Sequence, residues 1–311
     1  MPTMSGRIKF EQIAAELAEV ENLLAASSPS DFAGRIGLEE RADELRNELS
    51  TISTESRNLA SVALYFGGKP VIGSRSIDAE FAANMLNSYQ NIVTRVWQEG
   101  VSELTDQRRI LDQSASHFHV TNILHGSFGF ALEEIDENGI PLFPSALREA
   151  SDRVAEFISA IADDDEEVFS DLMTILNNRI FSELRNFFRN LYKANATFRL
   201  VGESIDKTFD YISVSRAYER AEQTNIDEEE FLVFGELLGI IPFGRRFEFK
   251  RSDDETIISG KVGLLFSQEY LERISKEQLA GKPCLAVFQR REIKKLGKTR
   301  ETFVLIRLEK I

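Results

Sequence analysis

Three histidines form the pattern in this chain that comes nearest to a metal-binding or catalytic site. They lie at positions 117, 119 and 125, and the chain has no others. Alternate residues of a strand share a face, so His117 and His119 are expected to point the same way. Two neutral imidazoles in this arrangement bind zinc and similar ions, which favours a metal-dependent hydrolase. The alternative is a solvated strand face that binds nothing.

The position of the third histidine argues against a three-histidine site. His125 follows His117 at a distance of roughly 26 Å along an extended strand, so one ion cannot reach both. We therefore predict no metal and no cofactor, and keep His117 and His119 as the alternative ligand pair.

No other pattern in the sequence is typical of an active site. The glycines at 67–68 and 126–129 match neither a phosphate-binding loop nor a dinucleotide fingerprint. A nucleophile elbow, a zinc-protease helix and the kinase motifs are all missing. Two acidic runs, 163–167 and 227–230, lack the spacing of a metal-binding loop, and we interpret them as helix N-terminal or loop residues. We predict no catalytic residue from these patterns.

Basic residues near the C-terminus form the most extensive candidate binding surface. Residues 240–311 hold 16 Lys and Arg against ten Asp and Glu, whereas residues 1–239 hold 21 against 41. Three phenylalanines lie among these cations, and a charged groove with aromatic side chains is typical of proteins that bind single-stranded nucleic acid. We predict that nucleic acid or a protein partner binds to nine residues of this segment: Arg245, Arg246, Lys250, Arg251, Arg290, Arg291, Lys294, Lys295 and Lys298.

The competing interpretation of the same segment is structural. On that view Phe247, Phe249 and Phe288 belong to an apolar core, and the cations pair with the acidic remainder of the chain or with a partner. The opposite charges of the two segments favour this alternative, and both interpretations stay open at this point.

The first 60 residues carry two apolar heptad seams separated by a segment rich in helix-breaking residues, 25–37. This pattern predicts two helices in an antiparallel, coiled-coil-like hairpin. A narrow seam either docks the hairpin on its own domain or forms an interface between copies of the chain. The residues predicted for such oligomerisation are Phe10, Ile13, Leu17, Val20, Leu24, Leu38, Leu45 and Leu49.

The middle of the chain alternates between strand and helix patterns. Gly67-Gly68 between two apolar runs predicts a β-hairpin, and a helix is expected from residue 78 to about residue 98. Residues 117–135 are expected to form one long strand, followed by a helical block, two paired strands and a short helix that ends near residue 223. This segment is expected to be a mixed α+β body.

The C-terminal segment has the element order of a small barrel. Strand patterns cover residues 231–241, 245–251, 256–264, 282–292 and 301–309, and a helix is expected over 267–279. Three strands, a helix and two strands is the order of an OB-type barrel. An SH3-like barrel or an open α+β sandwich is the alternative.

These patterns together predict an α+β protein with a helical hairpin at 1–58, a body at 59–226 and a small β-barrel at 227–311. A single cysteine, Cys284, excludes an intramolecular disulfide and any cysteine zinc site. No signal peptide and no apolar stretch long enough to span a membrane are visible, so we expect a cytoplasmic protein without a membrane partner.

The function expected from the sequence is that of a non-enzymatic interaction or scaffold protein. It is expected to be oligomeric and to present the basic C-terminal barrel as a binding surface. The first alternative is a nucleic-acid-binding protein that acts through the same barrel. The second alternative is a metal-dependent hydrolase that uses His117 and His119.

Overall fold

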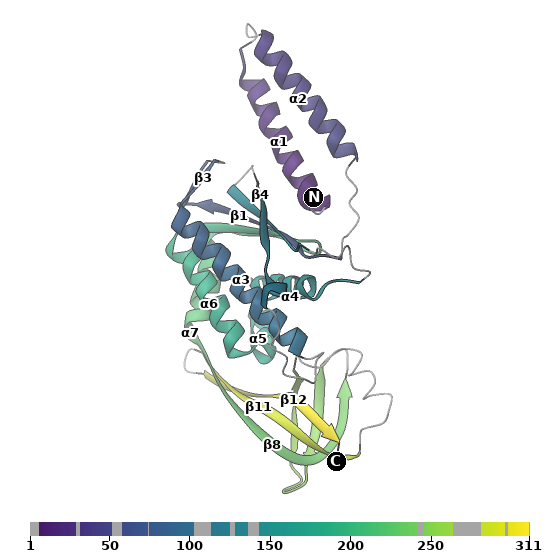
Figure 1. The fold of residues 1–311 in the computed structure, drawn as a ribbon. Coiled ribbons are helices and arrows are strands. Elements are labelled where there is room, and N and C mark those ends of the chain that lie inside the picture. Colours follow the sequence, from purple (N-terminus) through teal and green to yellow (C-terminus); the bar gives the residue numbers. More distant parts are fainter. Residues whose placement is uncertain are drawn as a thin grey trace.

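In a computed structural model, the chain is mixed α and β. A helical hairpin, an α+β body and a ring of strands follow one another along the chain and are stacked end to end (Figure 1). The structure describes residues 6–28, 32–51, 58–73, 75–102, 113–124, 128–135, 143–241, 245–263, 281–295 and 298–310.

The two N-terminal helices, α1 (Gly6–Ala26) and α2 (Phe32–Thr51), form the predicted antiparallel hairpin (Figure 1). Their heptad seams face one another within the chain. The apolar cluster between them comprises Ile13, Val20, Ala42 and Leu45, which are buried, and Leu17, Leu24, Leu38 and Leu49, which are partly buried. Of the residues predicted for oligomerisation, only Phe10 is largely exposed, at 44%. The seams are therefore occupied within the hairpin, although Leu23 and Phe32, outside the seams, are 50% and 75% exposed. Oligomerisation through these helices stays a prediction.

The base of the hairpin is anchored on the body. Ile8 of α1 is 1% exposed and belongs to a buried cluster with residues of the body sheet, among them Tyr65 and Val201. Beside it, Nδ2 of Asn122 donates a hydrogen bond to Oε1 of Gln12 over 3.0 Å. The rest of the hairpin projects away from the body (Figure 1).

The body contains a five-stranded antiparallel sheet in the order β4-β5-β1-β6-β7. Its central strand β1 is buried along five consecutive residues, because the sheet carries helices on one face and the base of α1 on the other. The strands are β1 (Ser61–Gly68), β4 (His119–Leu124), β5 (Phe128–Glu133), β6 (Ala196–Val201) and β7 (Asp206–Phe209), and a separate small pair is β2 (Val71–Ile72) and β3 (Ser76–Ile77).

Two local predictions for the body are wrong. The expected long strand over 117–135 is two antiparallel strands, β4 and β5. The prediction failed because a pattern of strand-forming residues does not show where the chain reverses. The expected hairpin at the glycine pair does not form, since β1 continues to Gly68 and pairs with β5 and β6 instead. Gly68 has a φ of 84°, and a Cβ there would lie 2.4 Å from the backbone oxygen of Asn195. The glycine therefore allows β1 to end against the turn before β6.

Helices cover one face of the sheet and enclose a core rich in phenylalanine. The ring of Phe198 on β6 lies 5.6 Å from Phe66, 5.3 Å from Phe187 and 5.6 Å from Phe209, centroid to centroid. None of the helices that the structure describes is long and apolar enough to cross a membrane. The body helices are α3 (Ala79–Ser102), α4 (Ala146–Ala162), α5 (Glu166–Ile175), α6 (Asn178–Lys193) and α7 (Tyr211–Gln223), with a short 3-10 turn at Gln113–Ser116.

The C-terminal segment forms a closed ring of five strands in the order β10-β12-β11-β8-β9, which we call the strand ring. Strands β10 and β12 run parallel, and the other neighbours are antiparallel. Phe247, Phe249 and Phe288 are buried in its centre, as the structural interpretation requires. The strands are β8 (Thr224–Ile241), β9 (Arg246–Arg251), β10 (Ile257–Val262), β11 (Pro283–Lys295) and β12 (Lys298–Lys310).

The strand ring and the body share part of one core. Strands β8 and β11 are long enough to reach the body, and Ile226 and Ile293 lie opposite each other in register at that end. Both side chains belong to the apolar core of the body. The ring is therefore fixed to the body by buried contacts. The helix expected over 267–279 lies outside the described residues.

Candidate functional site

The predicted basic residues on β11 are engaged within the strand ring. Lys294 lies 2.9 Å from Asp227, and the hydrogen bond that it donates lowers the pKa of that carboxyl. Arg290 pairs with Glu301 on β12 and lies 3.8 Å from Glu229 on β8. The acidic run at 227–230, interpreted from the sequence as a loop or helix start, is part of strand β8. It supplies the counter-ions for β11.

The basic residues at the end of β9 are also paired. Lys250 lies 3.2 Å from Glu255, and Nε of Arg251 donates to Asp253 over 2.9 Å. The hydrogen bond to Asp253 is also the main reason why the pKa of Arg251 is raised. These two cations face their own turn, so their charge is largely balanced locally.

The remaining predicted cations divide into three cases. Arg245 donates a hydrogen bond to the backbone oxygen of Gly263 and so closes the start of β9 onto the end of β10. The side chains of Lys295 and Lys298 lie outside the described residues. Arg246 is exposed and forms no ion pair with any residue that the structure describes.

Arg291 holds the strand ring to the body instead of facing a partner. Its side chain is 4% exposed, and one guanidinium nitrogen donates to the backbone oxygens of Thr174 and Leu176 over 3.3 and 3.1 Å. Its Nε lies 3.2 Å from Glu228 and donates to Gln289 over 2.7 Å. Because these contacts bury its charge between α5 and β11, the prediction that Arg291 belongs to an exposed binding surface is wrong.

A second carboxylate lies beside this buried arginine. Glu99, near the end of α3, is mostly buried, and burial raises its pKa from 4.5 to about 7. The charge of Arg291 opposes this shift, whereas Glu228 adds to it. The contact between the body and the strand ring therefore contains a carboxyl group that titrates near neutral pH.

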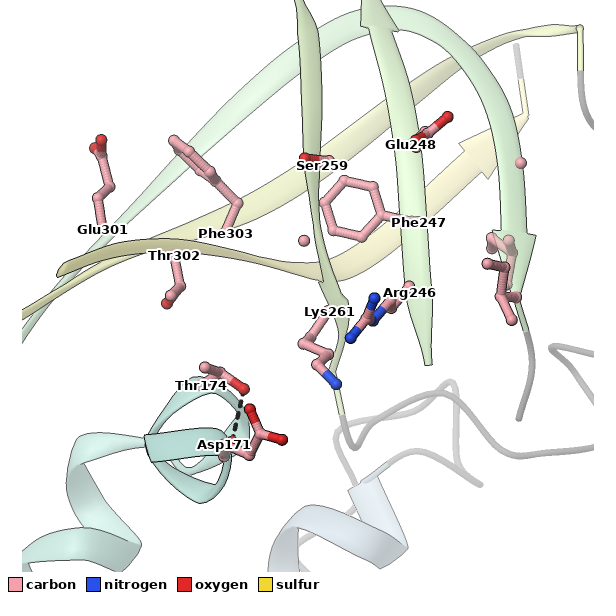
Figure 2. Close-up of a pocket in the computed structure, with 14 residues that line it drawn as sticks. Asp171, Thr174, Arg246, Phe247, Glu248, Ser259, Lys261, Glu301, Thr302 and Phe303 are labelled. Carbon is pink, nitrogen blue, oxygen red and sulfur yellow. Dashed lines mark hydrogen bonds between the residues drawn. The ribbon is translucent and has the colours of Figure 1, made fainter. Parts of the chain in front are cut away.

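A cavity of about 780 Å³ lies between α5 and the strand ring (Figure 2). We call it the ring cleft. Pockets of this kind form preferentially where two domains meet. Its lining comes from α5 (Asp171 and Thr174) and from four strand segments, 239–241, 246–248, 259–261 and 301–303.

Two cations lie side by side in the ring cleft. Arg246 on β9 and Lys261 on β10 are direct partners in the antiparallel register, so their side chains leave the same face of the ring. Within the described residues neither one forms an ion pair. Like charges directly opposite each other destabilise a sheet, so this pair has a cost unless an anion offsets it. Figure 2 shows both side chains on the side of the cleft that faces α5.

The cleft also contains an unsatisfied hydroxyl group. Oγ1 of Thr302 is buried and has no hydrogen-bond partner among the described residues. Figure 2 shows this side chain directed toward α5, on the same side of β12 as Thr174. A buried hydroxyl group without a partner is uncommon and indicates a position where a ligand or water supplies the missing bond.

Of these three cleft residues, Arg246 was predicted from the sequence, whereas Lys261 and Thr302 were not. Both lie in segments that were expected to be strands, and Lys261 follows Gly260, whose Cβ would lie 2.0 Å from the backbone oxygen of Phe303. That glycine was the available signal, because it marks a close approach of two strands. Which residues face each other across strands depends on register, which the composition of each strand does not specify.

His117 and His119 do not assemble into a site with other ligands among the described residues. His119 is the first residue of β4, His117 precedes that strand, and both side chains are exposed. No group of three or more His, Cys, Asp or Glu side chains among the described residues is arranged to hold a metal ion. His125 lies outside the described residues.

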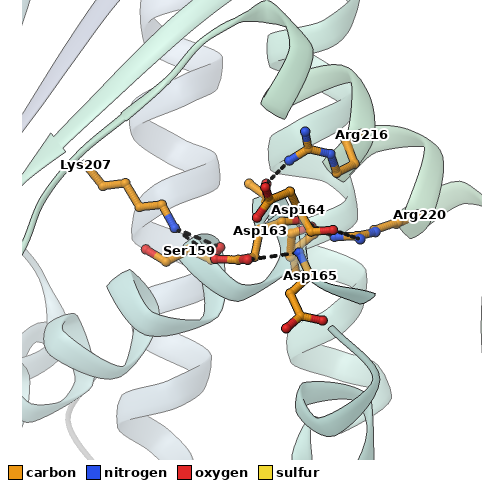
Figure 3. Close-up of polar contacts among 9 residues, drawn as sticks. Ser159, Asp163, Asp164, Asp165, Lys207, Arg216 and Arg220 are labelled. Atoms are coloured by element: carbon orange, nitrogen blue, oxygen red, sulfur yellow. Dashed lines mark hydrogen bonds and ion pairs between the residues drawn. The ribbon is translucent and has the colours of Figure 1, made fainter. Parts of the chain in front are cut away.

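The acidic run at 163–167 has a structural role at the turn between α4 and α5. Asp165 caps α5 by accepting a hydrogen bond from the backbone N–H of Glu167 over 2.8 Å. Lys207 lies 3.4 Å from Asp163, and Arg220 donates to the backbone oxygen of Asp163 (Figure 3). These contacts confirm that the run completes a helix N-terminus and fastens a turn.

Replacing Asp165 by alanine is expected to destabilise the protein by about 1 kcal/mol, because α5 loses its N-cap. The Asp165→Asn variant should retain most of that stability, since an amide oxygen also accepts the hydrogen bond. Thermal unfolding with and without about 5–10 mM Mg²⁺, an excess over the physiological concentration, measures both effects. A Mg²⁺-dependent rise in Tm that disappears in Asp165→Asn would contradict the structural role.

Comparison with known proteins adds no assignment to this geometry. No family model matches the chain, and no curated protein or solved structure matches it. The ring cleft and the distribution of charge around it are therefore the features that bear on function.

Proposed function

We propose that the chain is a non-enzymatic interaction protein in which the hairpin and body support an OB-type barrel, and that its partner binds in the ring cleft. The order of the ring supports the barrel type. Numbered in chain order, the first strand pairs with the second, the second with the third, the third with the fifth, the fifth with the fourth, and the fourth with the first. The third and fifth strands, β10 and β12, are parallel. This is the pairing expected of a five-stranded Greek-key barrel of the OB type.

The position of the cleft is the observation that carries the proposal. OB-type barrels bind ligands on the face of their second and third strands, between the loops that join strands one to two and four to five. The ring cleft is lined by β9 and β10, which are the second and third strands. It is also lined by the end of β8, which precedes the first of these loops, and by the start of β12, which follows the second.

The chemistry of the cleft favours binding. Its described lining offers two cations, carboxylates, hydroxyl groups and partly exposed apolar side chains such as Ile240 and Phe303. No imidazole or thiol occurs among these lining residues. A cytosolic setting suits the free, buried thiol of Cys284.

Site-specific photo-crosslinking in cells tests where the partner binds. A benzophenone side chain at Ser259, which is exposed in the cleft, is expected to give a discrete covalent adduct. The same group at Leu232, on the outer face of β8 and 53% exposed, is the matched control and is expected to give little. The Ser259 adduct should weaken when Arg246 is replaced by Glu. Adducts that form at Leu232 but not at Ser259 would refute the proposed binding surface.

A further inference from the structure

We propose that the ring cleft binds single-stranded nucleic acid and that a backbone phosphate lies between Arg246 and Lys261. This inference rests on the proposed function, because it assigns a ligand class to the same cleft. It differs from the expectation of a broad basic surface, since it confines the phosphate contact to two cations.

The charges of the strand ring support this restriction. Six of the predicted binding cations are engaged within the chain, by the contacts described above for Arg245, Lys250, Arg251, Arg290, Arg291 and Lys294. Arg246 and Lys261 are the cations in the lining of the cleft, and neither has an ion-pair partner among the described residues. Within the described residues, no ion pair therefore competes with an external anion for these two side chains.

The two cations and the neighbouring hydroxyl group match the chemistry of a phosphate. A guanidinium group donates to two phosphate oxygens at once, and an ammonium group adds a compact positive charge. The buried hydroxyl group of Thr302, which lacks a partner in the described structure, is a third donor in the same cleft. An anion here also relieves the repulsion between two like charges placed directly opposite each other.

The lining of the cleft limits the length of strand that it can bind. Phe303 packs against the core of the strand ring, 6.1 Å from Phe231 between ring centroids, and lies on the opposite side of β12 from Thr302 (Figure 2). It therefore presents no ring face beside the two cations. Asp171 and Glu248 on the cleft wall oppose further phosphates, so the structure favours a short contact over a long groove.

This arrangement predicts a weak dependence of binding on salt. For single strands, the slope of log K against log salt is about −0.7 for each phosphate contact. One phosphate held between the two cations therefore predicts a slope of about −0.7, whereas nine cations that each held a phosphate would give about −6. The slope separates the two arrangements without any variant.

Fluorescence anisotropy with the full-length protein and a fluorescein-labelled, mixed-sequence single strand of about ten nucleotides, a length within one OB barrel's binding site, tests the proposal. Titrations between 50 and 200 mM NaCl give the affinity and the slope. The double variant Arg246→Gln, Lys261→Gln is expected to bind at least about tenfold more weakly and to lose most of the slope. Thr302→Val should weaken binding by a smaller factor.

Lys282→Gln is the matched control, because it removes one exposed lysine outside the cleft and should leave affinity and slope unchanged. Thermal unfolding of every variant must show that the fold is retained. Inorganic phosphate and a nucleoside monophosphate serve as competitors. If the monophosphate binds as tightly as the oligonucleotide, the ligand is a free phosphate compound and the assignment to a strand is wrong.

Other outcomes separate this inference from the proposed function. A slope near −6, or unchanged affinity of the double variant, would show that phosphate binds elsewhere. No oligonucleotide binding at 50 mM NaCl, with the Ser259 photo-adduct retained, would reject the nucleic-acid ligand but keep the cleft as the binding surface. An acidic peptide that binds only when Arg246 and Lys261 are present would then identify the ligand as polypeptide. If no oligonucleotide binds and the Ser259 photo-adduct is also absent, both the nucleic-acid ligand and the cleft as the binding surface are rejected.

Discussion

Replacement of Arg291 by alanine is expected to lower the free energy of unfolding by about 3–5 kcal/mol, the cost of breaking a buried ion pair by removing one partner. The guanidinium group satisfies two backbone oxygens of the body and lies against Glu228. Without it, these oxygens lose their hydrogen-bond donor. Two nearby carboxyl groups, Glu228 and Glu99, also lose the neighbouring positive charge of the guanidinium group. The loss acts at the contact between body and strand ring.

The neighbouring Arg290 provides a control with the same chemical change. It is exposed and pairs with Glu229 and Glu301 on the surface, so Arg290→Ala should change stability very little. Arg291→Lys should recover only part of the lost stability, because an ammonium group does not reproduce the forked geometry of a guanidinium group.

Chemical denaturation monitored by circular dichroism measures this difference. Limited proteolysis of the Arg291→Ala variant should also show faster cleavage between the body and the strand ring. Equal stabilities of Arg290→Ala and Arg291→Ala would contradict the role of Arg291 in fastening the ring to the body.

The variant Glu99→Gln is expected to be more stable than the natural chain at pH 8, by up to about 3 kcal/mol. The pKa of Glu99 is raised by burial from 4.5 to about 7, and each pKa unit corresponds to about 1.36 kcal/mol. The unfolded chain releases this proton near pH 4.5, whereas the folded chain retains it until about pH 7. Stability from this group therefore falls as the pH rises between these values, and the full penalty applies above pH 7.

Denaturation of both proteins between pH 4.5 and 8 tests this expectation. The difference in stability between Glu99→Gln and the natural chain should be small at pH 4.5, grow through pH 6 and level off above pH 7. The comparison isolates Glu99 because every other titrating group is present in both proteins. A difference that is constant with pH would show that Glu99 is charged in the folded protein throughout this range.

The parts of the fold that depend on local patterns could be predicted from the sequence. The heptad seams identified the hairpin, since each seam follows from spacing along one helix. The order of strands in the C-terminal segment could be read because strand patterns and turn residues are also local. The reversal between β4 and β5 was missed, because a continuous run of strand-forming residues does not show where the chain turns back.

The candidate site depended on contacts that are distant in sequence. Arg290 and Arg291 are adjacent and identical in type, yet one is exposed and the other is buried under α5. That difference arises because β11 extends beyond the strand ring and packs on the body, which no local pattern encodes. The pairing of Arg246 with Lys261 likewise follows from the register of β9 and β10.

Hydrogen–deuterium exchange of the full-length protein, with and without a saturating short single-stranded oligonucleotide, tests most directly whether the ring cleft is the binding surface. We predict slower exchange at residues 246–248, 259–261 and 301–303 and in α5, with no change on the outer face of β8 around Leu232 and Phe234. Protection confined to that outer face or to the helical hairpin, or no protection at all, would contradict the account.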